Sequence, residues 1–205
     1  MEESFFDASY VKAQAMTVER PCNEIDYILE KLPEGASILY MGCGNGRHAI
    51  YLAEKGFKVD AFDICENNIS KLRRKAKKED LNINVWVEDV RRFEFKKDYN
   101  LIIANGLLEY VDKEKRDIII KQIKSHTKIG GYNLIVVFTD ILELPEEIRP
   151  YVIGIFKNGE IKEYYKDWAV KNYQTYKCCD EHNHNNMQTM NKIIVRKPYK
   201  IGAIV

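Results

Sequence analysis

A glycine-rich loop between two apolar runs gives this chain the layout of a nucleotide-cofactor site. The run Ile38–Met41 leads directly into three alternating glycines, which let a backbone approach a ligand and adopt dihedral angles that a Cβ forbids. A second run, Phe57–Phe62, leads to Asp63, where a carboxylate can accept hydrogen bonds from ribose hydroxyls. We therefore expect this loop and strand end to bind a cofactor through Gly42, Gly44, Asn45, Gly46, Asp63 and Ile64.

The glycines alone do not identify the cofactor. The stretch Gly44–Ala49 fits the G-x-G-x-x-G/A pattern of dinucleotide-binding proteins. The stretch Gly42–Gly46 is also G-x-G-x-G, the usual loop of S-adenosylmethionine (SAM) methyltransferases. A tight strand-to-helix turn without any ligand is the third interpretation, so the remaining elements must decide.

Alternating strands and helices predict the elements that position this loop. Strands are expected at residues 37–41, 57–63, 84–87, 99–104 and 132–138, helices at 22–32, 47–55, 66–79 and 113–127, and a turn at Gly130-Gly131. Such alternation indicates a doubly wound parallel sheet, which binds ligands at the carboxyl ends of its strands. One continuous site is therefore expected at the strand tips Gly42–Gly46, Asp63, Asp89, Asn105 and Thr139-Asp140.

The pattern changes after Asp140. A strand at Val170–Cys178, a polar loop and a last strand at Lys192–Arg196 predict an antiparallel hairpin at the sheet edge. The whole chain, residues 1–205, is expected to form one domain, with residues 1–20 as an N-terminal extension that could act as a lid over the cofactor.

Composition limits the function classes. The net charge of +1 gives no electrostatic case for nucleic acid, and the basic run Lys71–Lys78 is interpreted as a solvated helix face. No apolar run approaches the ~20 residues that span a bilayer, and the N-terminus lacks a signal-peptide pattern. Five cysteines, an odd number, indicate free thiols in the cytoplasm. The adjacent Cys178 and Cys179 do not have zinc-site spacing, so no metal is expected.

Several segments together resemble the class I SAM-dependent methyltransferases, and more narrowly the bacterial tellurite-resistance methyltransferase family. They are the cofactor loop, the second strand tip, the fifth strand and a tail stretch in two parts, at Gly42–Arg47, Asp60–Asp63, Gly130–Val136, Phe156–Glu160 and Tyr164–Trp168. The tail stretch is much more specific than the glycine loop. The resemblance covers roughly residues 20–197 and implies a Rossmann-like, doubly wound, seven-stranded and mostly parallel sheet with an antiparallel C-terminal hairpin.

The resemblance also implies roles for individual residues toward SAM. Asp63 would bind the ribose hydroxyls, Asp89 the adenine amino group with Val90 beside it, and Asn105 would close the methionine end. The alternative for Asp89 is a helix N-cap without a ligand. The family has an aspartate that supports the loop where this chain has Tyr40; the exchange would alter SAM binding, or the tyrosine has been absorbed into the packing.

The acceptor that the resemblance implies is a tellurium or selenium oxyanion, whose lone pair needs no strong base. The hydrogen-bond donors to its oxygens would be His182, His184 and Arg47. The alternative for the two histidines is that they are solvated loop residues. The residues also allow three different functions: methyl transfer to another small thiol or metabolite, SAM binding by a sensor with little turnover, and nicotinamide-dependent oxidoreduction. We expect a small-molecule acceptor, no nucleic acid or membrane partner, and a homodimer as one possible assembly.

Overall fold

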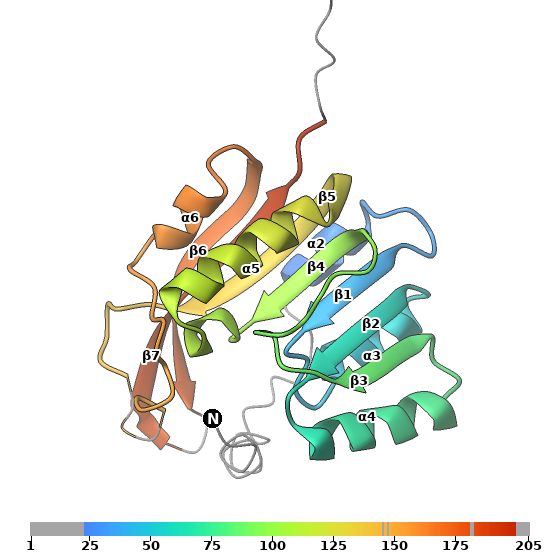
Figure 1. The fold of residues 1–205 in the computed structure, drawn as a ribbon, viewed down its shortest axis with the longest axis horizontal. Helices are drawn as coiled ribbons and strands as arrows, with labels where there is room; N and C mark the ends of the chain where they lie inside the picture. Colours follow the sequence, from blue (N-terminus) through green and yellow to red (C-terminus); the bar gives the residue numbers. More distant parts are fainter. Residues whose placement is uncertain (1–22, 145, 147, 181–182, 200–205) are drawn as a thin grey trace, which may run out of the picture.

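All described strands belong to one seven-stranded sheet (Figure 1). The computed structural model describes residues 23–144, 146, 148–180 and 183–199, so the expected extension at residues 1–20 lies outside the described part. The sheet order is β3-β2-β1-β4-β5-β7-β6. The strands are β1 Ser37–Met41, β2 Lys58–Asp63, β3 Ile83–Val87, β4 Tyr99–Asn105, β5 Thr127–Phe138, β6 Ala169–Asp180 and β7 Asn183–Arg196.

Strands β1 to β5 pair in parallel, whereas β7 is antiparallel to both β5 and β6. The expected Rossmann-like, mostly parallel sheet with an antiparallel C-terminal hairpin is therefore confirmed. Parallel strands need crossover connections. Helices at Arg47–Glu54, Glu66–Lys78 and Lys113–Ser125 supply three of these connections, whereas β3 and β4 are joined by a segment without a helix. Among the described residues, no helix is both long and apolar enough to cross a bilayer.

Helices cover both faces of the sheet (Figure 1). Apolar residues of α2 (Asn23–Leu29), α3 (Arg47–Glu54) and α4 (Glu66–Lys78) join one buried cluster. Those of α5 (Lys113–Ser125), α6 (Glu160–Tyr164) and the 3₁₀ turn η1 (Leu108–Tyr110) join the other. Strand β1 contributes alternate side chains to the two clusters, as a strand buried on both faces must.

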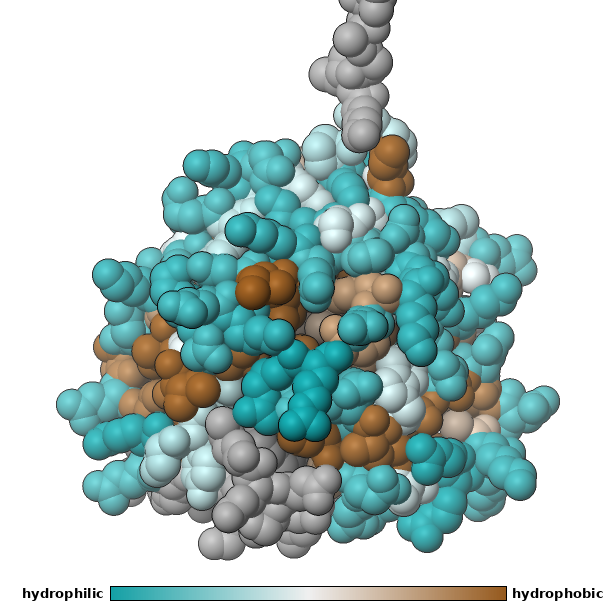
Figure 2. All heavy atoms as spheres, in the orientation of Figure 1, coloured by the Kyte–Doolittle hydropathy of each residue, from teal (hydrophilic) through white to brown (hydrophobic). Residues whose placement is uncertain are grey.

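Helix α4 confirms the interpretation of the basic run. Its apolar residues Ile69, Leu72 and Ala76 are buried, while the lysines and arginines between positions 71 and 78 are exposed. Hydrophilic residues likewise dominate the face of the molecule in Figure 2, with apolar side chains gathered in separate patches. Gly56 ends α3 with a φ of 86°, the left-handed value expected of a C-terminal cap.

Two expectations for the C-terminal half are wrong. Gly130-Gly131 is not a turn but part of β5, where the β4–β5 register shifts between the pairs Tyr99–Thr127 and Leu101–Tyr132. The glycines therefore serve an irregularity within a strand. The polar loop expected after Cys178 is largely strand, because β6 and β7 stay paired out to Asp180–Asn183. Backbone hydrogen bonds continue the ladder there although the side chains are polar.

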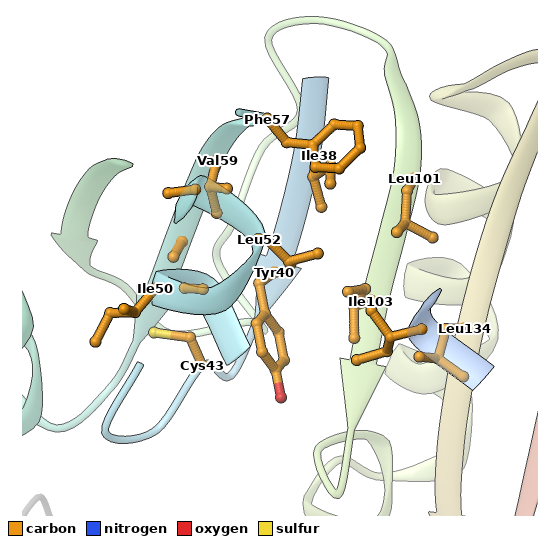
Figure 3. Close-up of a cluster of buried hydrophobic side chains, with 14 of the residues drawn as sticks. Ile38, Tyr40, Cys43, Ile50, Leu52, Phe57, Val59, Leu101, Ile103 and Leu134 are labelled. Atoms are coloured by element: carbon orange, nitrogen blue, oxygen red, sulfur yellow. The ribbon is translucent and has the colours of Figure 1, made fainter. Parts of the chain in front are cut away.

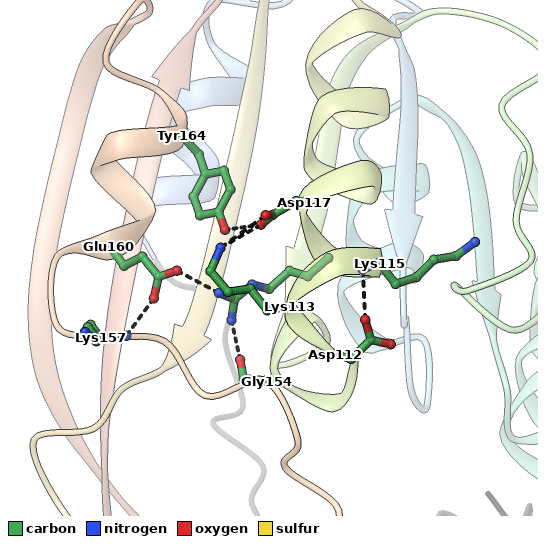
Figure 4. A network of polar contacts seen from close by, with 9 residues as sticks. Asp112, Lys113, Lys115, Asp117, Gly154, Lys157, Glu160 and Tyr164 are labelled. Carbon is green, nitrogen blue, oxygen red and sulfur yellow. Dashed lines mark hydrogen bonds and ion pairs between the residues drawn. The ribbon is translucent and has the colours of Figure 1, made fainter.

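Arg116 fastens α5 to the tail that follows β5. Its side chain, 2% exposed, forms an ion pair of 2.7 Å with Glu160 and donates to the carbonyl oxygen of Gly154. Figure 4 labels these two partners and marks both contacts with dashed lines. The guanidinium lies 3.7 Å from the ring centroid of Phe156, within range of a cation–π interaction. The stretch 154–160 is thus held against α5 by one buried cation.

Candidate functional site

A cleft lies at the carboxyl ends of the parallel strands, where the sequence predicts a site. The loops after β1, β2, β3 and β4 supply its walls, and the residues lining it are Gly42, Phe62, Asp63, Ile64, Glu88, Asp89, Val90, Arg91, Gly106, Leu107, Tyr110 and Val111. Five of the predicted cofactor residues, Gly42, Asp63, Ile64, Asp89 and Val90, are therefore brought together at one cleft.

Asp63 connects the cleft to the glycine loop. Its carboxylate, at the end of β2, accepts hydrogen bonds from the backbone N–H of Gly44 (2.7 Å) and of Cys65 (3.0 Å). Burial raises the pKa of Asp63, and the bonds from Cys65 and Gly44 oppose this rise. A carboxylate has about four acceptor positions, so Asp63 retains acceptor capacity toward a ligand in the cleft.

The loop glycines also have packing reasons to be glycine. Gly42 has a φ of 65°, and a Cβ there would come within 2.9 Å of Leu107. Gly46 has a φ of 77°, and its Cβ would lie 2.3 Å from a methyl carbon of Leu72. Gly46 therefore lets the start of α3 pack closely on α4, while Gly42 leaves room in the cleft. Gly44, Asn45 and Gly46 do not line the cleft themselves.

Asp89 faces the cleft as one member of an ion pair. Arg91 Nε lies 2.9 and 2.8 Å from Oδ1 and Oδ2 of Asp89, and Oδ1 also accepts the Arg91 backbone N–H at 2.9 Å. Burial by itself would raise the pKa of Asp89, but the hydrogen bonds and charge of Arg91 hold it below its ordinary value. No helix begins here, so the N-cap alternative is wrong: Asp89 caps a turn.

Tyr40 is absorbed into the packing on the α3 face of the sheet. Figure 3 shows its ring among the apolar side chains and its hydroxyl pointing away from them. The residue is 4% exposed, and its hydroxyl oxygen lies 3.0 Å from Nδ1 of His48 in the first turn of α3. Burial, together with the charge of Arg47, lowers the pKa of His48. Cys43 of the glycine loop is buried in the same cluster.

A buried acid lies behind the cleft wall. Glu109 of η1 is fully buried, and a Cβ placed on Gly106 would lie 3.9 Å from its Oε1. No described side chain donates a hydrogen bond to its carboxyl group. Burial raises the pKa of Glu109 to about 8, although the backbone N–H groups of Glu109 and Phe138 and the charge of Arg116 act to lower it.

The other predicted site residues lie elsewhere or outside the described part. Asn105 is the exposed last residue of β4, next to the cleft residue Gly106. The expectation that Thr139 and Asp140 share the site is wrong: Thr139 is buried and donates to the carbonyl oxygen of Thr189, and Asp140 accepts from the backbone of Asn158.

The acceptor candidates are placed only in part. Arg47 opens α3 and is half-buried. His184 belongs to β7, and His182 lies outside the described residues. Within the described ranges no group of acids, histidines and cysteines is arranged to hold a metal ion.

Sequence reasoning missed the cleft residues Arg91, Gly106, Leu107 and Val111 and the contact between Tyr40 and His48. The sequence does carry a signal for the contact between Tyr40 and His48, since a tyrosine lies near the end of the strand before the loop and a histidine lies in the first turn of the helix after it. Leu107 carries no such signal, because an apolar residue after β4 can equally line a cleft or belong to the core.

Comparisons with known proteins agree with this geometry. Residues 8–196 match the family described as tellurite resistance protein TehB. The probable S-adenosyl-L-methionine-dependent methyltransferase TehB of Haemophilus influenzae is 35% identical over 143 residues, which cover 70% of this chain and 49% of the relative. The crystal structure of TehB from Haemophilus influenzae superposes with a TM-score of 0.77 and 30% identity, covering 88% of this chain and 63% of that one.

A more distant relative is the ubiquinone biosynthesis O-methyltransferase of Rickettsia typhi, 30% identical over 158 residues, which cover 74% of this chain and 59% of the relative. The chain spans about half the length of the curated TehB relatives that it matches. The family match, however, takes in the glycine loop, every cleft residue and the C-terminal hairpin. The chain therefore belongs to the TehB tellurite resistance protein family.

Proposed function

We propose that this chain is a SAM-dependent methyltransferase that acts on a small, soft acceptor. The observation that carries the proposal is Asp63, a buried carboxylate that lines the cleft while one oxygen holds the Gly44 amide of the cofactor loop. The two curated relatives support it, because the name of one includes S-adenosyl-L-methionine and both are named as methyltransferases.

The residues of the cleft fit the parts of SAM. Gly42 has no side chain between the loop backbone and the methionine portion, and Asp63 has acceptor capacity for ribose hydroxyls. Ile64 and Val90, both partly exposed, offer apolar surface to the adenine ring, and Asp89 offers an oxygen acceptor to its amino group. Because Arg91 already occupies both Asp89 oxygens, its guanidinium must share or yield them when adenine binds.

SAM supplies the activated methyl group through its sulfonium, so the protein needs to align the reactants and exclude water. Leu107, Tyr110 and Val111 form the part of the cleft wall that follows β4, beside Gly42. We propose that these side chains screen the transfer from water. Asn105 would close the methionine end from the neighbouring strand tip.

For the acceptor we propose a tellurium or selenium oxyanion, as the family description suggests. Its lone pair is a soft nucleophile, so hydrogen-bond donors to its oxygens are needed rather than a base. We propose His182, His184 and Arg47 as these donors. We place the reaction in the cytoplasm, in keeping with the free buried thiol of Cys43.

Two experiments test the function. Thermal shift with SAM and with NAD identifies the cofactor: at 100 times its Kd, a ligand stabilises the protein by about 2.7 kcal/mol. Methyl transfer to tellurite, selenite and a panel of small thiols then identifies the acceptor. Stabilisation by NAD but not SAM would refute the cofactor assignment. Turnover of thiols but not oxyanions would favour the second acceptor class, and SAM binding without turnover would indicate a sensor.

The acceptor donors are tested by His182→Ala and His184→Ala, with His126→Ala as control. His126 pairs with Asp98 at 3.0 Å and does not line the cleft. Loss of a proton donor should lower kcat/KM for the acceptor about 10²–10⁴-fold in one of the two variants, with SAM affinity within about twofold. If both variants match the control, the histidines have no part in the reaction.

A further inference from the structure

Tyr40 and His48, which flank the glycine loop in sequence, are hydrogen-bonded to each other. Tyr40 precedes Gly42 by two residues, and His48 follows Gly46 by two. The 3.0 Å contact between the Tyr40 hydroxyl and His48 Nδ1 therefore joins the end of β1 to the first turn of α3, across the segment that forms the cofactor loop. The two rings are also nearly parallel, with an interplanar angle of 13°.

The loop needs such a constraint because its three glycines all have positive φ angles, of 65°, 54° and 77°. Glycine loses more conformational freedom on ordering than any other residue. Two hydrogen bonds tie the loop to β2: the Cys43 N–H donates to the carbonyl oxygen of Phe62, and the Gly44 N–H donates to Asp63. Both act on the first half of the loop, whereas Tyr40–His48 holds its exit into α3.

The chemistry of the pair suits this task. Burial, with the charge of Arg47, lowers the pKa of His48 and so favours the neutral ring. In the tautomer protonated at Nε2, His48 Nδ1 accepts the hydrogen bond of the Tyr40 hydroxyl. The Tyr40 ring is buried in the cluster that also holds Cys43, Leu52 and Ile103, which restricts its movement. Tyr40 is therefore the fixed member of the pair, and its hydrogen bond positions His48 at the start of α3.

We propose that Tyr40 and His48 are positioning residues that hold the glycine loop in the shape that binds the cofactor. Neither lines the cleft, so they act through the loop backbone and not through contact with the ligand. This inference rests on the proposed function, because it takes SAM to be the ligand of the loop.

The test compares Tyr40→Phe, His48→Ala and the double variant with the wild-type chain. Calorimetry gives the SAM Kd, and steady-state kinetics give KM for SAM and kcat at saturating SAM. Each single variant should weaken SAM binding about three- to tenfold, the factor that one hydrogen bond is worth. The double variant should be no weaker than either single one, because both changes remove the same bond. The kcat at saturating SAM should be unchanged.

Rescue and control variants separate positioning from a general effect on the fold. The side-chain oxygen of asparagine lies where histidine has Nδ1, so His48→Asn should recover most of the SAM affinity that His48→Ala loses. Tyr165→Phe is the matched control, since Tyr165 is fully buried and no described residue bonds its hydroxyl. It should leave the SAM Kd unchanged.

The outcomes are distinct. If the wild type binds SAM and the Tyr40 and His48 variants bind it equally well, the pair does not position the loop, and the proposed function stands. Lower melting temperatures with unchanged Kd, or additive effects in the double variant, overturn the inference in the same way. If the wild type binds no SAM, the proposed function fails and the inference fails with it.

Discussion

Asp63→Asn changes a side chain that lines the cleft and accepts a hydrogen bond from the backbone of the glycine loop. An amide keeps one oxygen, so it can accept from either Gly44 or Cys65 but not from both. Its NH₂ group must then face the N–H that has lost its acceptor. The variant therefore breaks one short hydrogen bond to a charged acceptor without changing the volume of the side chain.

The expected loss of stability follows from these contacts. A hydrogen bond to a charged group is worth about 1.5–3 kcal/mol. Part of this is regained, because burial disfavours the charged carboxylate, as the raised pKa of Asp63 shows. We expect a net loss of about 1–2 kcal/mol, which lowers the melting temperature of a domain of this size by about 2–8 °C.

SAM affinity should fall further than stability. A ribose hydroxyl that donates to the carboxylate makes another charge-assisted bond, so its loss should weaken binding about 10- to 150-fold. Scanning calorimetry of the free variant measures the first effect and titration calorimetry with SAM the second. The free variant must remain folded at the titration temperature.

Asp60→Asn is the matched control on the same strand. Asp60 is also buried, and it accepts from the Tyr99 hydroxyl (2.7 Å) and from Lys97 Nζ (2.8 Å), but it does not line the cleft. This variant should lose stability and keep SAM affinity. Equal SAM affinity in Asp63→Asn and the wild type would remove Asp63 from the site, and an equal loss in both variants would show that the effect is not local.

Three further changes test the surroundings of the site. Because burial raises the pKa of Glu109 to about 8, the folded chain keeps a proton that the unfolded chain releases near 4.5. The free energy of unfolding of the wild type should therefore fall as the pH rises from about 5 to 8. Urea titrations at pH 6 and 9 should show this fall in the wild type and not in Glu109→Gln. Arg116→Met removes the ion pair with the partly exposed Glu160 and the hydrogen bond to the Gly154 carbonyl oxygen, and should lower the free energy of unfolding by about 1.5–3 kcal/mol in urea. A loss below about 0.5 kcal/mol would contradict the role of the cation. Gly46→Ala meets both a positive φ and Leu72, and should cost about 2–4 kcal/mol by thermal unfolding. The same change should cost less in a Leu72→Ala background, and an equal cost in both backgrounds would show that the contact with Leu72 does not matter.

The half of the chain that carries the glycine loop could be predicted closely from sequence. The expected bounds of the first strand, residues 37–41, agree with β1, and the second strand ends at Asp63 as predicted. Apolar runs, glycines and a terminal acid are local signals, and in a parallel sheet they fix which residues meet at the carboxyl edge. Five predicted cofactor residues therefore line one cleft.

The features that sequence reasoning missed depend on contacts between distant residues. Arg116 reads as an ordinary polar residue on a helix, yet Glu160 and Phe156, about 40 positions later, bury it. Polarity after Cys178 suggested a loop, but a ladder between two strands satisfies the backbone whatever the side chains are. Gly130-Gly131 resembles a turn locally, and only the register of β4 against β5 shows a strand irregularity.

The position of β7 in the sheet has a consequence for synthesis of the chain. β7 is the last of the described strands in sequence, yet it lies between β5 and β6. During synthesis on the ribosome, β6 is therefore completed before its described neighbour β7 exists. The backbone groups on the β7 side of β5 are unpaired at that stage as well. Both strands are satisfied only when residues up to Arg196 have emerged. Until then the nascent chain exposes two unpaired strand edges, the kind of surface on which chaperones and aggregation compete.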